Sequence, residues 1–262
     1  MDSSIVQAIA LGAVQGLSEF LPVSSSGHLV IFPWLFGFSD PGLSFDVALH
    51  AGTLIAVIWY FWRDWLNIFR LRHDMPEYHG SSNLLFFVVI ATVPGAIAGA
   101  LLEKQAETIF RNPLLIAATL FIFGALLLAV DKYGKKARSF EKITLRDALV
   151  IGCAQAIAIV PGVSRSGITI TAALARGINR ASAARFSFLL SMPIICAALL
   201  ANVKAFLSVG VTPAFAAGVL SSAISGYFAI SYLIRFVEQA SYQAFFWYRT
   251  VIAAIIVSFF CL

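Results

Sequence analysis

The sequence predicts an all-α, polytopic membrane protein built from two related halves. Of its 262 residues, 60% are hydrophobic and only 12% are charged, which is about half the charged fraction of a typical soluble domain. Several apolar stretches are long enough to cross a bilayer, which takes about 20 residues. Two further apolar regions are each interrupted by a cluster of Pro, Gly and Ser, and the two interruptions are similar in sequence. Together these observations predict membrane helices arranged as an internal repeat.

This composition excludes several other classes of protein. A soluble enzyme or a disordered chain would carry more charge, and the three cysteines lie singly in apolar runs, without metal or disulfide spacing. The net charge of +5 comes from basic residues that separate apolar stretches, as in the loops of a membrane protein. Membrane lipids are therefore the expected partners, and no nucleic acid is expected.

The elements follow in chain order. Residues 3–37 are apolar but are interrupted by Pro, Gly and Ser, which predicts a re-entrant hairpin, a broken helix that enters the bilayer and turns back. Residues 145–178 predict a second such hairpin, and for both regions two plain spans stay open as the alternative. Unbroken spans are expected at 45–62, 84–102, 114–130, 186–203, 213–234 and, if Arg249 snorkels from its end, 244–262.

The two interrupted regions are related to each other. Residues 11–30 align with 151–170 at an offset of 140, and six of the twenty aligned pairs are identical, where unrelated apolar segments would share about one or two. The identical pairs are Gly12/Gly152, Gln15/Gln155, Val23/Val163, Ser24/Ser164, Ser26/Ser166 and Gly27/Gly167. We expect one membrane domain, 1–262, divided into repeat one (1–131), a connecting loop (132–144) and repeat two (145–262).

The topology follows from this division. Each half holds one hairpin and three spans, an odd number, so the second half is expected to be inverted relative to the first. If loop 63–83 is cytoplasmic, the loops on that side hold 14 Lys and Arg residues, and the opposite side holds 3, as the positive-inside rule requires. Both termini would then face outward, on the side away from the cytoplasm. The two hairpins would enter from opposite sides, so that their serine-rich tips can meet.

The interruption in region 3–37, which we call the first break, carries the groups expected of a reactive site. The interruption in region 145–178 is the second break. Glu19 and His28 enclose three serines within ten residues, and ionisable groups at bilayer depth are costly and usually functional. Gln15 and Glu19 are four residues apart, so a helix presents both on one face. Pro22 is expected to end this helix. Ser24, Ser25 and Ser26 would cap the next helix. Gly27 would let the backbone of that helix approach a ligand closely.

The second break adds a cation, Arg165, and further small polar residues. A helix N-terminus with hydroxyl groups and an arginine binds phosphate well. The groups together suit phosphoryl transfer, with Ser25 as nucleophile and His28, three residues later, as its base. Arg165 would stabilise the negative charge, and Glu19 would hold a divalent cation or orient the imidazole. The second break is Pro161, Gly162, Ser164, Arg165, Ser166 and Thr169.

Structural roles stay open for the same residues. Serine and glycine in membrane helices commonly serve close packing. Glu19 and Arg165 can form a buried ion pair that bridges the repeats. Asp46 and His50, one helical turn apart, can line the site or lie outside it.

At these two breaks the chain resembles the undecaprenyl-diphosphate phosphatase family of bacterial inner-membrane enzymes, also called the bacitracin-resistance family. The first family signature is an acid or glutamine, then glutamate four residues later, then PVSSxGH, and it matches Gln15, Glu19 and 22–28. The second, PGxSRSxxT, matches 161–169. The order, spacing and chain length agree, so the resemblance covers essentially the whole chain.

The resemblance implies removal of the terminal phosphate from a C55 isoprenyl diphosphate. The monophosphate would be recycled for peptidoglycan synthesis, which confers bacitracin resistance, and the active site would face the periplasm. Dependence on a divalent cation, Mg²⁺ or Ca²⁺, is also implied. A homodimer is a further option. A lipid-phosphate flippase without hydrolysis remains the alternative, because paired broken helices are typical of transporters.

The resemblance also implies roles for the matching residues. Ser25 would be the nucleophile, His28 its base or a competing nucleophile, and Glu19 catalytic or metal-associated. Many family members carry glutamate where this chain has Gln15, a neutral amide, so a two-carboxylate metal site is not expected and Gln15 would assist Glu19 as a ligand. The diphosphate would be cradled by Ser24, Ser26, Gly27, Gly162, Ser164, Arg165, Ser166 and Thr169.

Overall fold

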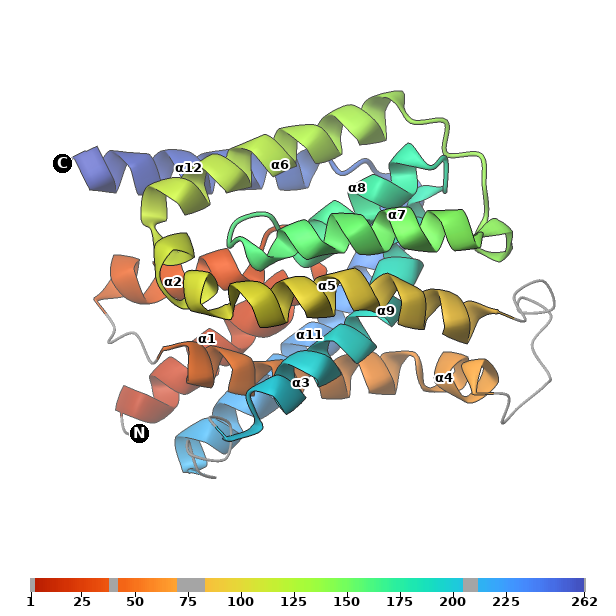
Figure 1. Cartoon of the computed structure of the whole chain (residues 1–262). Coiled ribbons are helices and arrows are strands. Elements are labelled where there is room, and N and C mark those ends of the chain that lie inside the picture. The colour runs from red at the N-terminus through yellow and green to blue at the C-terminus, as the bar shows by residue number, and fades with distance from the viewer. Residues whose placement is uncertain (1–2, 38–41, 70–82, 205–211, 262) are drawn as a thin grey trace.

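The structure, a computed structural model, describes residues 3–37, 42–69, 83–204 and 212–261 (Figure 1). Within these ranges, strand-type pairing is limited to a single bridge between Arg138 and Ile178, so the expected all-α fold class is confirmed. Three single turns, η2 (Ile109–Arg111), η3 (Phe140–Lys142) and η4 (Ile157–Ile159), connect longer helices. Those helices are α1 (Ser3–Phe20), α2 (Ser25–Phe36), α3 (Leu43–Tyr60), α4 (Trp62–Ile68), α5 (Leu84–Glu107), α6 (Pro113–Tyr133), α7 (Leu145–Ala156), α8 (Arg165–Ala175), α9 (Arg180–Ala201), α11 (Pro213–Gln239) and α12 (Gln243–Cys261).

The long helices agree with the predicted spans. Among the described residues, α5, α6, α9, α11 and α12 are each long and apolar enough to cross a membrane. A sixth span results if α3 and α4, which meet at a 74° bend, are counted as one. The predicted span 45–62 corresponds to α3. The chain is therefore a multi-pass membrane protein.

The two interrupted regions each fold as a pair of helices around a short break. The first break separates α1 from α2, and the second, which includes η4, separates α7 from α8. Helices α2, α7 and α8 hold 12, 12 and 11 residues. At about 1.5 Å per residue each is roughly 16–18 Å long, well short of the ~30 Å hydrocarbon core. The prediction of two broken helices is confirmed.

The two hairpins begin at opposite ends of the molecule. Figure 1 places both chain ends at its left, whereas the connection from α6 to α7 lies at its right. The first hairpin therefore starts near the end that carries the termini, and the second starts near the other end. This arrangement agrees with entry from opposite sides of the bilayer, and the symmetry that would relate the two halves stays a prediction.

Close packing of small residues sets the position of α1, which carries Glu19. A Cβ added at Gly12 would lie 2.2 Å from the carbonyl oxygen of Gly218 on α11, so the two backbones are in direct contact, as small residues allow in membrane helices. Helix α11 also packs on α3, where Ser222 Oγ donates to the Leu49 carbonyl at 3.0 Å. Helices α1 and α3 are thereby held together, with the last turn of α1 next to the first half of α3.

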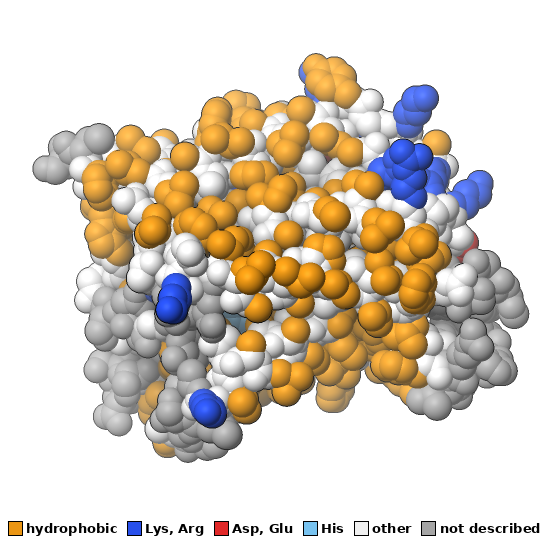
Figure 2. Space-filling view, in the orientation of Figure 1, with side chains coloured by type: hydrophobic (Ala, Val, Ile, Leu, Met, Phe, Trp, Pro, Cys, Tyr) orange, Lys and Arg blue, Asp and Glu red, His pale blue; other side chains and the backbone are white. Residues whose placement is uncertain are grey.

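Charge is concentrated at the ends of the molecule. Figure 2 shows hydrophobic side chains across the middle of the visible face and most Lys and Arg side chains at the end where α6 connects to α7. Hydrogen bonding to Asp147 raises the pKa of the Arg138 guanidinium in that connection. Further ion pairs hold the same end together, namely Arg138–Asp147 at 2.6 Å, Arg176–Asp147 at 2.8 Å, Arg180–Asp131 at 2.6 Å and Arg185–Asp64 at 2.6 Å.

Candidate active site

The two breaks have the same local geometry. Ser24 is the N-cap of α2 with φ 77° and ψ 94°, and Ser164 is the N-cap of α8 with φ 73° and ψ 112°. Positive φ is uncommon for residues other than glycine. In each break the cap hydroxyl accepts the N–H of the glycine three residues later, at 3.3 Å from Gly27 and 3.1 Å from Gly167. The duplication seen in the sequence therefore extends to the backbone.

The two breaks also contact each other directly. The Gly162 N–H donates to Ser24 Oγ at 2.9 Å, and Ser166 Oγ donates to the Leu21 carbonyl at 3.1 Å. Gly162 has φ +88°, and a Cβ there would lie 2.0 Å from Thr119 Oγ1 on α6. The expected meeting of the serine-rich tips is confirmed. The glycine is needed for close approach to α6, whereas the sequence had suggested glycines that approach a ligand.

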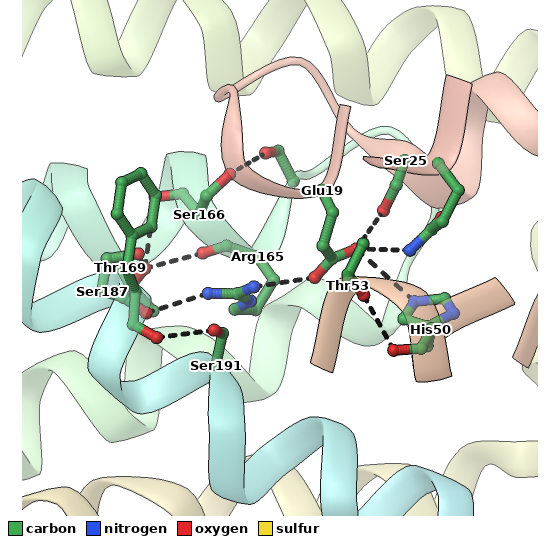
Figure 3. Close-up of polar contacts among 12 residues, drawn as sticks. Glu19, Ser25, His50, Thr53, Arg165, Ser166, Thr169, Ser187 and Ser191 are labelled. Carbon is green, nitrogen blue, oxygen red and sulfur yellow. Dashed lines mark hydrogen bonds and ion pairs between the residues drawn. The ribbon is translucent and has the colours of Figure 1, made fainter. Parts of the chain in front are cut away.

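Glu19, at the last turn of α1, is the centre of the polar contacts (Figure 3). Its Oε1 accepts from Arg165 Nη2 at 2.7 Å, and its Oε2 accepts from Ser25 Oγ at 2.6 Å. Gln15 Nε2 donates to the same Oε2 at 3.2 Å, as expected for residues four apart on a helix. Glu19 is only 6% exposed. One carboxylate thus joins the hydroxyl of the first break to the cation of the second.

The ion pair that the sequence left open as a structural bridge is present, and it also lines a cavity. Arg165 is fixed on its other side, because its Nη1 donates to the Ser187 carbonyl at 2.9 Å. The Arg165 guanidinium is therefore held between the Ser187 carbonyl and the Glu19 carboxylate, and its binding of phosphate stays a prediction.

His50, on α3, completes the surroundings of Glu19. Its Nε2 lies 3.5 Å from Glu19 Oε2, and its Nδ1 lies 2.7 Å from the Asp46 carbonyl oxygen. Because a carbonyl oxygen only accepts hydrogen bonds, Nδ1 carries a proton. Whether Asp46 and His50 line the site is open from the sequence alone, and the structure places both on the cavity wall.

His28 lies apart from this group. Its Nδ1 donates to the Ser24 carbonyl at 2.7 Å, and its Nε2 lies 2.8 Å from the Tyr248 hydroxyl of α12. The rings of His28 and Tyr248 stack with centroids 5.6 Å apart. Both ring nitrogens are therefore engaged by groups other than Ser25. In this geometry the nearest base to the Ser25 hydroxyl is the Glu19 carboxylate, and a catalytic role of His28 stays a prediction.

A cavity of about 440 Å³ opens beside these groups, and we call it the central cavity. One part of its wall is polar. The other part is made of small and apolar side chains of α5 and α9, including Ala96, Gly99, Ala100, Ile194 and Ala198. The polar part comes mainly from the end of α1, both breaks, α3 and η2, with Gln155 of α7 and Asn202 at the end of α9 in addition. Its other members are Ser18, Glu19, Ser24, Ser25, Ser26, Asp46, His50, Arg111, Ser164 and Arg165.

The predicted phosphate-binding residues divide into two groups. Ser24, Ser26, Ser164 and Arg165 line the central cavity together with Ser25. The others lie behind its wall and hold the breaks in place. Thr169 is fully buried and bonds the Arg165 carbonyl at 2.8 Å and Ser187 Oγ at 2.7 Å. Gly27, Gly162 and Ser166 are also buried in the contact between the breaks.

Arg249 does not snorkel from the end of α12, and this prediction is wrong. Its side chain is 0% exposed. It donates to five main-chain carbonyls, three of which lie in the breaks, where carbonyls lack helical partners and need donors. The acceptors lie in α6, the first break and the second break: Thr119 (3.3 Å), Leu120 (2.9 Å), Pro22 (3.3 Å), Gly162 (2.7 Å) and Val163 (3.2 Å).

The residues around Glu19 do not fit a resident divalent cation. No group of three His, Cys, Asp or Glu residues in the described ranges is close enough to hold a metal ion. The Arg165 guanidinium at 2.7 Å already neutralises the carboxylate, and Gln15 presents its N–H to Glu19, while its Oε1 is buried without a hydrogen-bond partner among the described residues. Oxygen-rich ligand sets, which Mg²⁺ and Ca²⁺ require, are not formed by these side chains.

Fold and site together define a multi-pass helical membrane protein with a cavity lined by serines and arginines where its two helix breaks meet. A family model described as bacitracin resistance protein BacA matches residues 8–255, and the chain belongs to this family.

Several undecaprenyl-diphosphatases are similar to this chain over almost its full length. An undecaprenyl-diphosphatase of Moorella thermoacetica is 50% identical over 259 residues, which cover 99% of both chains. One of Pelotomaculum thermopropionicum is 48% identical over 248 residues, 95% of this chain and 94% of the relative. One of Gemmatimonas aurantiaca is 47% identical over 258 residues, 97% of both chains.

Proposed function

We propose that this protein hydrolyses undecaprenyl diphosphate to undecaprenyl monophosphate and phosphate. The observation that carries the proposal is the contact of Ser25 Oγ and Arg165 Nη2 with the two oxygens of Glu19, at 2.6 and 2.7 Å, in one cavity. These are a hydroxyl, its base and a phosphate-binding cation. The names of relatives with 47 to 50% identity support the choice of substrate.

The chemical steps follow from these contacts. Glu19 takes the proton of the Ser25 hydroxyl, and Ser25 Oγ forms a bond to the terminal phosphorus. The phosphorus–oxygen bond to the inner phosphate breaks, and the lipid monophosphate leaves with the proton held by Glu19. Water then attacks the serine phosphate and gives a proton to Glu19. The bond from Ser25 Oγ to phosphorus breaks, phosphate leaves, and Ser25 Oγ takes that proton from Glu19. Arg165 and the N–H groups at the starts of α2 and α8 stabilise the phosphate oxygens.

The apolar part of the central cavity suits the isoprenyl chain. The wall formed by α5 and α9 carries small and aliphatic side chains next to the polar groups, so an amphiphile can place its phosphates at Arg165 and its chain along these helices. Nothing in this wall defines a chain length of 55 carbons. The substrate length rests on the relatives.

We propose the bacterial inner membrane as the location, with both termini and the cavity opening on the periplasmic side. The excess of basic residues in the loops, 13 against 3 once the buried Arg249 is left out, supports this orientation. The common end of the two chain termini supports it as well. The matching geometry at Ser24 and Ser164 supports an inverted repeat.

In the cell, the proposed reaction would return the lipid carrier to peptidoglycan synthesis. We also propose a role in bacitracin resistance, which the description of the family supports. We further propose that the divalent cation binds the diphosphate oxygens of the substrate, because Glu19 is paired with Arg165. A homodimer stays a prediction, which cross-linking in membranes would test.

The second candidate is a carrier that moves a lipid phosphate without hydrolysing it. The observation in its favour is the meeting of two broken helices at one cavity, which is the usual plan of alternating-access transporters. A carrier needs a phosphate-binding cavity but no nucleophile with a base. The Ser25–Glu19 contact of 2.6 Å therefore favours the hydrolase.

The test is phosphate release from undecaprenyl diphosphate by purified protein in detergent, with added Mg²⁺, Ca²⁺ or chelator. Wild type should release phosphate, and Ser25→Ala should reduce the rate by about 10³-fold or more, as for loss of other nucleophiles. His28→Ala should retain most of the rate if Glu19 is the base. If well-folded wild type releases no phosphate with any cation, the carrier becomes the better hypothesis.

A further inference from the structure

The central cavity contains a second arginine that the proposed reaction does not use. Arg111 is the last residue of η2, the single turn between α5 and α6. Its side chain lines the central cavity and is 17% exposed. Together with Arg165 it supplies two guanidinium groups to one cavity. A guanidinium matches the geometry of phosphate oxygens better than an ammonium does.

A continuous row of polar groups connects the two arginines along the cavity wall. Arg165 pairs with Glu19 at 2.7 Å, and Glu19 lies 3.5 Å from His50 Nε2. His50 Nδ1 lies 2.7 Å from the Asp46 carbonyl oxygen, and Asp46 Oδ2 lies 3.4 Å from Arg111 Nη1. The row crosses α8, α1, α3 and η2. Both arginines therefore face the same space from opposite ends of one wall.

The two arginine–carboxylate pairs differ in length. The Arg165–Glu19 contact of 2.7 Å has the length of a strong charge-assisted hydrogen bond, about 2.7–2.9 Å. The Arg111–Asp46 contact is 3.4 Å, although both side chains are largely buried, with 17% and 8% exposed. A long, mostly desolvated ion pair gains little net stability. The longer contact indicates that Asp46 holds the Arg111 guanidinium less tightly than Glu19 holds Arg165, so a phosphate oxygen can compete with Asp46 for it.

The position of the nucleophile assigns one phosphate to each arginine. Ser25 shares the Glu19 carboxylate with Arg165, so the phosphate under attack lies at Arg165. The phosphate that remains on the lipid then faces the rest of the wall, toward Asp46 and Arg111. We propose that Arg111 exchanges Asp46 for this inner phosphate and so determines the preference of the site for diphosphate lipids. This inference rests on the proposed function.

The experiment compares Arg111→Gln and Arg111→Lys with wild type in the detergent assay. Lys104→Gln is the matched control, since Lys104 is an exposed cation near the end of α5 and does not line the cavity. Loss of one charged hydrogen-bond donor should raise the KM for undecaprenyl diphosphate by about 10- to 100-fold. Arg111→Lys keeps the charge and should recover part of the loss, whereas Lys104→Gln should match wild type.

Product inhibition identifies which phosphate Arg111 binds. Undecaprenyl monophosphate keeps the inner phosphate, so its inhibition constant should rise in Arg111→Gln by a factor similar to that for KM. Inorganic phosphate occupies the Arg165 position, so its inhibition constant should stay within about twofold of wild type. An unchanged constant for the monophosphate, or a raised constant for inorganic phosphate alone, would overturn the assignment.

A binding measurement separates failure of this inference from failure of the proposed function. Thermal stabilisation of the purified protein by undecaprenyl diphosphate requires binding but no hydrolysis. If wild type does not hydrolyse the lipid yet is stabilised by it, and Arg111→Gln is not, the hydrolase proposal fails and the inner-phosphate contact stands. If both proteins are stabilised equally, the role of Arg111 is refuted whatever the activity.

Discussion

Replacement of Arg249 by Met should destabilise the protein and stop turnover, although Arg249 does not line the central cavity. Methionine keeps most of the side-chain length and removes all five donors. The α6 carbonyls of Thr119 and Leu120 lie in a helix interior and keep their helical partners. The carbonyls of Pro22, Gly162 and Val163 lie in the breaks and would lose their Arg249 bonds of 3.3, 2.7 and 3.2 Å.

The expected loss in the free energy of unfolding follows from these three carbonyls. An unsatisfied buried acceptor costs about 1–3 kcal/mol, and polar contacts in membrane proteins average nearer 0.6 kcal/mol, so three together give roughly 2–9 kcal/mol. Removal of the desolvated guanidinium offsets part of this cost, and we expect a net loss of roughly 3 kcal/mol. At about 2–4 °C per kcal/mol for a chain of this size, Tm should fall by about 6–12 °C.

The assay is thermal unfolding in detergent, followed by tryptophan fluorescence, together with phosphate release at a temperature where the variant is folded. Arg146→Met is the matched control, because Arg146 is an exposed arginine near the start of α7. Arg249→Lys should be intermediate, since an ammonium offers three donors from a single nitrogen. A Tm within about 2 °C of wild type, with full turnover for Arg249→Met, would refute the carbonyl-support role.

Three further predictions concern the cavity. Glu19→Gln should lower kcat by about 10²–10⁴-fold, the usual value of a general base, with Tm measured to confirm folding; a variant with more than a tenth of the wild-type rate would show that another group takes the proton. Gly99→Leu should fill the cavity without strain, because a Cβ at Gly99 meets no atom within 4 Å; it should raise the KM for long-chain lipid but leave inhibition by inorganic phosphate unchanged, and an unchanged KM would place the isoprenyl chain elsewhere. Gln15→Glu should keep turnover and steepen its Mg²⁺ dependence, because it adds a second carboxylate next to Glu19 Oε2, 3.2 Å from Gln15 Nε2; complete inactivation would indicate that a second charge is harmful there.

The broken helices and their meeting could be predicted from sequence because their signals are local or repeated. Pro22 and the serines after it end one helix and cap the next, and the offset of 140 residues shows that the chain does this twice. Apolar length predicts the remaining spans within a few residues. None of these inferences requires knowledge of how the helices pack.

The partner of Ser25 could not be predicted in the same way. A spacing of three residues predicts that Ser25 and His28 lie on one face of a helix. Both are on α2, but the Ser25 hydroxyl and the His28 ring nitrogens bond different partners. Ser25 is the first residue of α2, and the positive φ of Ser24 turns the chain back so that Ser25 meets Glu19, six residues earlier. His28 is instead bonded to Tyr248, 220 residues away.

Main-chain hydrogen bonding explains why the buried arginines lie where they do. A break in a membrane helix exposes N–H groups at the start of the next helix and carbonyls in the break itself, and both need partners at bilayer depth. The residues at the helix starts, Ser25 and Arg165, line the central cavity, where in the proposed reaction phosphate oxygens would accept their N–H groups. The break carbonyls point the other way and bond Arg249. The two needs of a break, donors for its carbonyls and acceptors for the N–H groups of the next helix, thus place Arg249 on one side of the breaks and, in the proposed function, the substrate phosphate on the other.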